Sequence, residues 1–350
     1  MVPAPSPESN IAWCHEAVQG VSRTFALTVD ILEEPMSSQI CLGYLLCRVA
    51  DTIEDAGHIS PESQVDLLQT FDAALDPSSN GTMKEFRAAV DSWLPPSADR
   101  NADWSVVAQL PTLWATFTNQ PESVQTAVVP LVREMVNGMS MFVERYADTG
   151  GLRINDRSEL EQYCYYAAGT VGRLITNLLT RGSVSQKRPR KLYDTADEFG
   201  LLLQLVNVSK DVYDDYTEEN NVYLPAEWLA DEGIDQGDLL CPSNRKSAAK
   251  VVERTASHAE TFLDDAQAYI EAMPLTHGNT IAAWSVPYLL SVGTIRELNA
   301  RPEDALTESG VKISRREVLA VVEAASTAGR DAIAEIRATI AQKPYHQALE

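Results

Sequence analysis

The chain has 350 residues, a formal net charge of −22 at pH 7 and 45% apolar residues. A chain of this length and composition can bury a sizeable core, so it is expected to fold rather than remain disordered. The negative charge argues against nucleic acid or an anionic lipid surface as a partner held by bulk charge, and it repels a free polyanionic substrate unless a cation intervenes. Only 8 of the 28 basic residues are lysine and the acidic residues are spread over the chain. This surface is typical of a halophile's cytoplasm, and an ordinary acidic soluble protein is the alternative.

The N-terminus and the cysteines indicate a soluble protein of a reducing compartment. The sequence "MVPAPSPESN" lacks the basic and apolar regions of a signal peptide, and residues 1–10 are predicted to form a disordered tail. The most apolar late segment, 281–295, is shorter than the roughly 18 residues that span a bilayer. The cysteines include no CxxC pair and are interpreted as buried apolar residues: Cys14, Cys41, Cys47, Cys164 and Cys241. We therefore expect a cytoplasmic protein.

Helical periodicity dominates the chain, without a convincing run of alternating strand residues. Gly57 ends the first clear helix, Asp156 and Glu159 have the spacing of a capping box, and "SVSQKRPRK" is a basic connector. Residues 96–103 are predicted to form a loop. The predicted helices cover 35–56, 60 to about 76, 121 to about 149, about 157 to 181, about 191 to 217, 244–272, 278–299 and 314–342.

No linker is long and flexible enough to divide the chain. Two acidic clusters, 51–55 and 211–215, lie far apart in the sequence. If they act together, the fold must bring them to one place. The sequence therefore predicts one all-α domain over residues 1–350, a large helical bundle without internal repeats.

The first cluster lies in "LLCRVADTIEDAGH", at the end of an apolar helix. Residues three and four apart share a helix face, so Asp51, Glu54 and Asp55 project together. Arg48 and Tyr44 fall on the same side at offsets of three and four. A solvated helix end is the alternative for this cluster alone.

The second cluster lies in "LLLQLVNVSKDVYDDYTEEN" and repeats this logic. Gln204, Asn207, Asp211 and Asp215 follow one another at spacings of three or four, which makes a polar stripe on an apolar helix. Gln204 and Asn207 are therefore expected at interior depth, where polar groups need partners.

Two clusters of carboxylates suit Mg²⁺, which proteins hold through one or two carboxylates together with substrate phosphates. Such metal bridges allow an acidic site to bind a diphosphate. Each cluster alone is better explained as a solvated face, and the pairing favours the metal site. The candidate ligands are Asp51, Glu54, Asp55, Asn207, Asp211 and Asp215.

Three further stretches fit a site for phosphate and hydrocarbon. "SRTF" offers Ser22 and Arg23 as diphosphate donors, although a single arginine near a turn is usually a surface residue. "YCYYAAGTVG" at 163–172 sets tyrosines beside small residues, which make room for a ligand or for tight helix packing. "NNVYLPAEWL" at 220–229 begins a new segment after the second cluster.

In this order, "SRTF", "YLLCRVADTIED", "YCYYAAGTVG", "LLLQLVNVSKDVYDD" and "VYLP" resemble the squalene/phytoene synthase family of head-to-head prenyl transferases. The match spans residues 22 to 225. The resemblance implies an all-α isoprenoid-synthase fold with a central active-site cavity between the two Asp-rich helices. It also implies that the protein binds prenyl diphosphates and contacts a membrane surface peripherally for product release. The oligomeric state is open, with a monomer favoured.

The resemblance further implies roles for individual residues. Tyr44 and Tyr166 would line the reacting centre, with Tyr166 matching the tyrosine assigned to proton transfer, and Phe25 would shelter the prenyl tails. Mg²⁺ would be held on the diphosphates by Asp51, Asp55, Asp211 and Asp215. The substrate-binding residues would be Ser22, Arg23, Phe25, Arg48, Gln204, Asn207 and Lys210.

The C-terminal stretches "SVPYLLSVGTIREL" and "GVKISRREV" look more like squalene synthases than phytoene synthases. This implies squalene formation from two farnesyl diphosphates through presqualene diphosphate, with NADPH as reductant. The chain has no GxGxxG fingerprint to support a dinucleotide independently. Lys312, Arg315 and Arg316 are candidates for a cofactor phosphate site, and a solvated helix start is the alternative.

Two positions depart from the family pattern. Lys210 stands where the family usually has arginine. Lysine keeps the positive charge but lacks the bidentate hydrogen-bonding geometry of a guanidinium. Asn221 stands where the family places an arginine ahead of "YLP", in a loop one residue longer.

The alternatives to a squalene synthase are a phytoene or dehydrosqualene synthase without reductant, a non-catalytic scaffold of the same fold, and an acidic metal-buffer protein.

Overall fold

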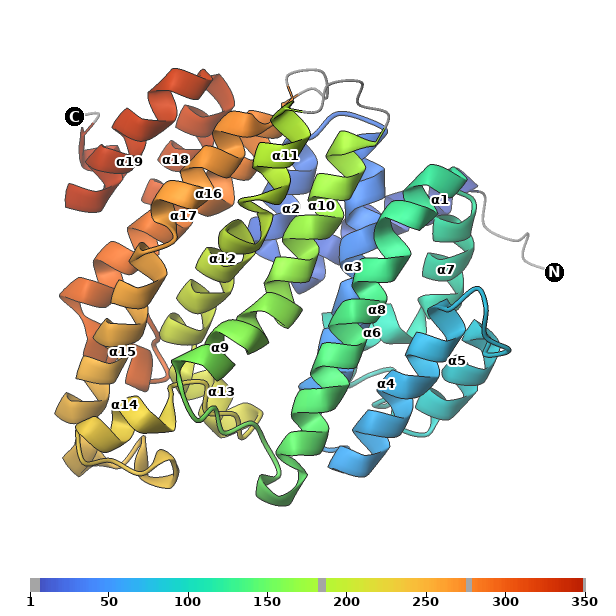
Figure 1. The fold of residues 1–350 in the computed structure, drawn as a ribbon, viewed down its shortest axis with the longest axis horizontal. Coiled ribbons are helices and arrows are strands. Elements are labelled where there is room, and N and C mark those ends of the chain that lie inside the picture. Colours follow the sequence, from blue (N-terminus) through green and yellow to red (C-terminus); the bar gives the residue numbers. More distant parts are fainter. Residues whose placement is uncertain (1–6, 182–186, 275–278, 349–350) are drawn as a thin grey trace.

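The computed structural model describes residues 7–181, 187–274 and 279–348. These residues form a bundle of α-helices in which the only strand-like pairing is one parallel bridge between Arg153 and Val222 (Figure 1). The helices of the first part are α1 (Pro7–Val21), α2 (Arg23–Ile31), α3 (Met36–Glu54), α4 (Pro61–Leu75), α5 (Met83–Asp91), α6 (Ala102–Ala108), α7 (Leu110–Thr118) and α8 (Glu122–Arg145).

The remaining helices include one π-helical turn, Tyr165–Gly169, between two α-helices. They are α9 (Arg157–Cys164), α10 (Thr170–Thr180), α11 (Lys187–Tyr193), α12 (Ala196–Lys210), α13 (Val212–Glu218), α14 (Ala226–Asp231), α15 (Arg245–Glu260), α16 (Leu263–Ala272), α17 (Thr280–Ala300), α18 (Arg315–Thr327) and α19 (Ile333–Gln342). No helix in the described ranges is long and apolar enough to cross a membrane.

The predicted all-α class is confirmed, and several helix boundaries differ. The helix expected over 191–217 is interrupted at 194–195 and again at Asp211, whose backbone (φ −100°, ψ 14°) leaves the helical region. The helices expected over 244–272 and 314–342 are likewise each divided in two. Residues 7–10, expected in a disordered tail, begin α1. The basic connector contains part of α11 from Lys187 onward, and its residues 183–186 lie outside the described ranges.

Half of the predicted capping box forms at the start of α9. The Asp156 side chain accepts from the Glu159 backbone N–H at 2.9 Å, as expected of an N-cap. The Glu159 carboxylate does not return to the cap. It accepts from the Tyr146 hydroxyl at 2.6 Å and from the Asn155 N–H at 2.7 Å, and it pairs with Arg145. Glu159 therefore joins α9 to the end of α8.

The core positions the site by bringing α3 and α12 to the middle of the bundle (Figure 1). One large buried cluster joins side chains of α3, α8, α10, α12 and α17, and a smaller one lies around Val212, Trp228 and Val252. Gly172 and Gly200 allow α10 and the π turn to approach α12 closely. A Cβ at Gly172 would overlap the carbonyl oxygen of Ala196, and one at Gly200 would overlap that of Ala168. Of the two roles left open for the small residues of "YCYYAAGTVG", Gly172 thus serves close helix approach.

Candidate active site

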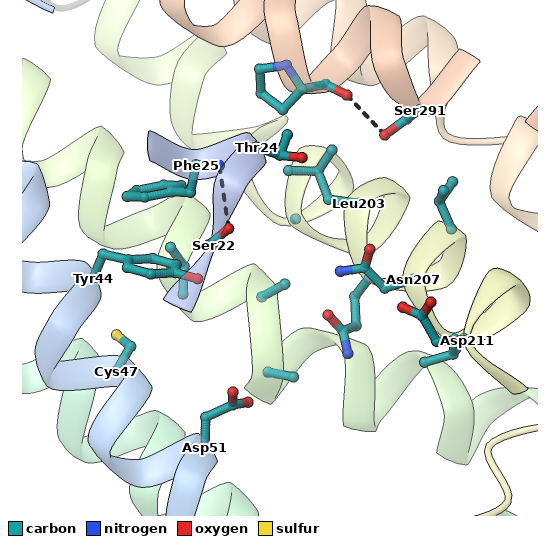
Figure 2. A pocket seen from close by; sticks show the side chains of 18 of the residues that line it. Ser22, Thr24, Phe25, Tyr44, Cys47, Asp51, Leu203, Asn207, Asp211 and Ser291 are labelled. Atoms are coloured by element: carbon teal, nitrogen blue, oxygen red, sulfur yellow. Dashed lines mark hydrogen bonds between the residues drawn. The ribbon is translucent and has the colours of Figure 1, made fainter. Parts of the chain in front are cut away.

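A cavity of about 640 Å³ lies between α3 and α12, and residues of α2, α8, α9, α10, α13 and α17 also line it. Figure 2 shows Asp51 on α3 facing Asn207 and Asp211 at the end of α12. The two acidic clusters, far apart in sequence, thus lie on one cavity. Its charged and amide lining residues are Arg23, Arg48, Asp51, Asp55, Gln204, Asn207, Lys210, Asp211, Asp215 and Glu219.

The first face of the cavity forms as the helical spacing predicts. Arg48 pairs with Asp51 through Nη1 and donates to the Tyr44 hydroxyl through Nη2 at 2.6 Å. The Tyr44 ring stacks on Phe25, with ring centroids 3.9 Å apart. Arg48 therefore ties the acidic end of the cavity to an aromatic wall built from α2 and α3.

Glu54 does not line this cavity. It is 3% exposed, one oxygen accepts from the Tyr163 hydroxyl at 3.5 Å, and Oε1 is buried without a hydrogen-bond partner in the described residues. It lines a second cavity of about 230 Å³, which shares Asp55 and Glu219 with the first. Of the metal ligands expected from the sequence, Glu54 is thus the one that does not line the main cavity.

The second face lies on α12 and the start of α13. Gln204, Asn207, Asp211 and Asp215 line the cavity, and Lys210 forms an ion pair with Asp211. Asp215 follows the break at Asp211, and its N–H donates to the Asp211 carbonyl at 2.9 Å. Both carboxylates therefore line the same cavity, although Asp211 lies between the two helices and Asp215 lies in α13.

Burial and repulsion from neighbouring carboxylates raise the pKa values of Asp55, Asp215 and Glu219. Burial and Asp51 raise the pKa of Asp55, and burial and Asp211 raise that of Asp215, well above their usual values. Burial, with Asp215 next in importance, raises the pKa of Glu219 to about 9. Buried like charges are relieved by protons or by cations.

The donor set fits a divalent cation. One carboxylate oxygen from each of Asp51, Glu54 and Asp55 lies within 4.8 Å of the others. Oε1 of Glu54 is buried and unpartnered in the described chain, and the ligands are hard oxygens of the kind that Mg²⁺ prefers. The residues therefore suit Mg²⁺.

Ser22 and Arg23 lie where the cavity meets the start of α2. The Ser22 Oγ accepts from the Phe25 N–H at 3.3 Å, so Ser22 is the N-cap of α2. Arg23 is the first helical residue and lines the cavity next to it. "SRTF" therefore combines a helix cap, a cation and an aromatic residue in the wall.

The opposite part of the cavity is apolar and aromatic. Trp284 of α17 lies between Phe25 and Phe199, with ring centroids 6.1 Å and 6.2 Å away. The other apolar residues of this part are Met135, Val171, Ile175, Leu203, Pro287 and Leu290. One end of the cavity thus suits a charged headgroup and the other a hydrocarbon.

Comparison with known proteins agrees with this arrangement. The squalene/phytoene synthase family profile matches residues 18–317. The chain belongs to this family. Squalene synthase of Homo sapiens is 24% identical over 290 residues, which cover 83% of this chain and 64% of that protein. Squalene synthase of Schizosaccharomyces pombe is 21% identical over 314 residues, covering 89% and 64%. The chain thus matches just under two thirds of the length of these relatives.

Solved structures of family members share the fold. A complex of TcSQS with the ligand E5700 has a TM-score of 0.76 at 19% identity, covering 99% of this chain and 100% of that one. A dehydrosqualene synthase bound to a ligand has a TM-score of 0.63 at 20% identity, covering 92% and 96%. The expected isoprenoid-synthase fold is therefore confirmed.

Tyr166 differs from the position that the family resemblance implied. It is not among the cavity-lining residues, because its ring packs on Gly138 of α8, where a Cβ would overlap it, and against Phe142. The π turn begins at Tyr165, and Tyr163, Ala167 and Val171 form the lining face at intervals of four. Tyr163 is thus the tyrosine of "YCYYAAGTVG" in the cavity wall.

Sequence reasoning missed Tyr163, Tyr223 and Glu219. The Tyr163 and Tyr223 hydroxyls lie 3.0 Å apart, and both residues line the cavity. No spacing rule pointed to this pair. Glu219 lies four residues after Asp215, so the stripe at 207, 211 and 215 could have been extended to it.

Asn221, the departure from the family arginine, has a structural role. It is 3% exposed. Its Oδ1 accepts from the Leu152 N–H at 2.8 Å, and its Nδ2 donates to the Tyr223 hydroxyl at 3.1 Å and to Glu219 at 3.3 Å. Asn221 therefore fixes the loop before "YLP" and supplies no positive charge.

The three basic residues expected to hold a cofactor phosphate lie outside the main cavity wall. Lys312, Arg315 and Arg316 are exposed at the start of α18, and none forms an ion pair or side-chain hydrogen bond within the described ranges. The cofactor phosphate site suggested for these three residues stays a prediction.

Proposed function

We propose that the protein joins two prenyl diphosphates head to head, with farnesyl diphosphate as substrate, presqualene diphosphate as intermediate and squalene as the NADPH-dependent product. The observation that carries this proposal is the single cavity with carboxylates on two opposing helices at one end and an aromatic, apolar wall at the other. This division matches the two chemical parts of a prenyl diphosphate. The family membership and the squalene synthases among its relatives support the choice of reaction.

The charged end binds and orients the diphosphates in this proposal. Asp51, Asp55, Asp211 and Asp215 would hold Mg²⁺, which when bound stabilises the charge of a leaving diphosphate. Arg23, Arg48 and Lys210 contribute positive charge at the same end and contact diphosphate oxygens. The amides of Gln204 and Asn207 complete the hydrogen bonding. Glu54, which faces the second cavity, is a weaker candidate ligand than its neighbours.

The apolar end holds the prenyl chains and excludes water, which would trap an allylic cation. The ring faces of Phe25, Tyr44 and Trp284 can stabilise positive charge that develops on carbon. Tyr44 and Tyr163 are tyrosines in the wall. The proton-transfer role expected of Tyr166 gains no support from its position against Gly138.

A phytoene or dehydrosqualene synthase is the second candidate function. It would use the same site without a reductant, and it is favoured by the position of Lys312, Arg315 and Arg316 outside the cavity wall. A scaffold is disfavoured because burying several carboxylates is costly without a function that uses them, and a metal buffer leaves the tyrosine motif unexplained. In either synthase, the apolar product would leave by contact with a membrane surface.

A product assay tests the proposal. Purified protein is incubated with farnesyl diphosphate and Mg²⁺ in high KCl, with and without NADPH. We expect presqualene diphosphate without NADPH and squalene with it. Dehydrosqualene under both conditions would establish the second candidate, product only from geranylgeranyl diphosphate would indicate a phytoene synthase, and release of no diphosphate from any chain length would favour the scaffold.

A further inference from the structure

Each nitrogen of the Arg48 guanidinium is contacted by a different side chain. Nη1 pairs with Asp51 and Nη2 donates to the Tyr44 hydroxyl at 2.6 Å. Nε lies 3.8 Å from Oδ1 of Asp103. Burial lowers the pKa of Arg48, but the neighbouring phenol and the two carboxylates raise it well above its usual value. Arg48 is therefore a fixed cation in the cavity wall.

Asp103 lies on α6, behind the wall of the cavity. It does not line the cavity, so it cannot contact a ligand there. Its helix packs against α3, and the adjacent Trp104 is buried with its ring 5.2 Å from that of His58. Oδ1 of Asp103 is buried and has no hydrogen bond in the described chain. The ion pair with Arg48 is its one favourable charged contact in that part of the chain.

Arg48 shares Asp51 with the proposed metal site. A carboxylate oxygen that binds a cation is less available to an arginine, so a loaded site weakens the Nη1 pair. Tyr44 and Asp103 then remain to orient the guanidinium. An arginine recognises phosphate oxygens through the fixed directions of its N–H groups, so its orientation determines how well it binds them.

We infer that Asp103 is a positioning residue that anchors Nε of Arg48, so that Nη1, once released by Asp51, is turned toward the substrate diphosphate. This inference rests on the proposed function. The competing view is that Asp103 adds only negative charge near an anionic ligand. The two views predict opposite effects when the charge is removed, because loss of an anchor weakens diphosphate binding and loss of a repelling charge strengthens it.

Asp103→Asn provides the test, since it keeps the shape and removes the charge. We measure steady-state kinetics with farnesyl diphosphate and Mg²⁺, and inhibition by inorganic pyrophosphate. Asp103→Asn is expected to lower kcat/KM about tenfold and to weaken pyrophosphate inhibition by a similar factor. Asp99→Asn, an exposed aspartate four residues earlier, is the matched control and is expected to leave both unchanged.

A double-mutant cycle separates positioning from a general structural effect. In an Arg48→Gln background, Asp103→Asn should cause no further loss, because it acts through Arg48. Unchanged kinetics, tighter pyrophosphate inhibition or additive losses would overturn the inference. If Asp103→Asn does not fold, Asp103→Glu replaces it, with a smaller loss of the same kind expected and wild-type pyrophosphate inhibition contradicting the inference.

The proposed function can fail separately. If the wild-type protein turns over no prenyl diphosphate, Mg²⁺-dependent binding of pyrophosphate to wild type and Asp103→Asn is measured directly by calorimetry. Weaker binding by the variant would still support the anchor, and equal or tighter binding would contradict it.

Discussion

The hydroxyls of Tyr163 and Tyr223 lie 3.0 Å apart and join two segments that are 60 residues apart in the sequence. Tyr163 is in α9, and Tyr223 is in the "VYLP" segment that follows the second acidic cluster. Tyr163 also donates to Glu54 at 3.5 Å, and Tyr223 accepts from Asn221 at 3.1 Å. The pair thus links α3, which carries the first acidic cluster, to the loop that follows α13 and the second cluster. It thereby fixes the positions of the two acidic faces of the cavity relative to each other.

Replacing Tyr223 by phenylalanine should destabilise the protein. The change removes one hydroxyl and leaves the buried groups of Tyr163 and Asn221 short of a partner, which typically costs about 1–3 kcal/mol. Urea unfolding should show a lower midpoint with an unchanged slope. Tyr213→Phe is the control, because the Tyr213 hydroxyl has no hydrogen-bond partner in the described residues. A midpoint equal to that of wild type would contradict the linking role.

Asp51→Asn and Asp211→Asn should each reduce turnover by more than about a hundredfold with the fold intact, because each removes a charged ligand from the proposed metal site. Asp214→Asn is the matched control. Asp214 lies in the same cluster but is exposed and does not line the cavity. Turnover and circular dichroism are measured together. Full activity of either of the first two variants would refute the metal-bridge proposal.

The metal-free protein should lose stability as pH rises. The pKa of Glu219 is raised from 4.5 to about 9, and that of Asp55 is raised as well. The folded state then binds more protons than the unfolded state between these values, so the free energy of unfolding falls as pH increases from about 5 to 9. Thermal unfolding across this range checks the prediction, and Glu219→Gln should flatten the slope. A rising melting temperature would contradict it.

Mg²⁺ should reverse this trend. A bound cation favours the ionised carboxylates, so the gain in melting temperature on adding Mg²⁺ should be larger at pH 9 than at pH 6. The same scans with and without Mg²⁺ measure this gain. Asp51→Asn should show a smaller gain at both pH values. An equal gain in the variant would place the bound metal elsewhere.

Gly172→Ala should destabilise the wall between α10 and α12. An added Cβ would overlap the backbone carbonyl of Ala196, which cannot move away as a flexible side chain could. Such overpacking typically costs about 1–3 kcal/mol. Gly237→Ala is the control, because a Cβ at Gly237 meets no atom within 4 Å. Urea unfolding of both variants measures the difference, and equal midpoints would show that the helices separate at little cost.

The parts of the site that a sequence predicts well are those within one helix. The spacing of Tyr44, Arg48 and Asp51 determines that they share a face, and the structure shows them in contact. Glu54 also joins this group as predicted, with a carboxylate oxygen within 4.8 Å of those of Asp51 and Asp55, but its contact with the Tyr163 hydroxyl comes from another helix. The spacing within one helix therefore predicts which side chains are neighbours. Which cavity each side chain lines depends on its contacts with other helices.

The sequence predicted that the two acidic clusters meet, but other relationships between segments were beyond sequence reasoning. In the helical segment that contains the π turn at 165–169, Tyr163 lines the cavity while Tyr166 packs on Gly138. Asp103 lies in a segment predicted as a loop, and nothing in its neighbours shows that it faces Arg48. The fold class, by contrast, follows from helical periodicity and from the family motifs in order, which the structure and the comparisons confirm.

In the proposed function, two acidic faces from distant parts of the chain form one metal-dependent diphosphate site. Calorimetric titration with an unreactive thio-analogue of farnesyl diphosphate tests it most directly, in wild type, Asp51→Asn and Asp211→Asn, with and without Mg²⁺. We expect binding only with Mg²⁺, and a loss of at least about tenfold in affinity in each variant. Binding that is independent of Mg²⁺, or that is unchanged in either variant, would contradict a shared metal-dependent diphosphate site.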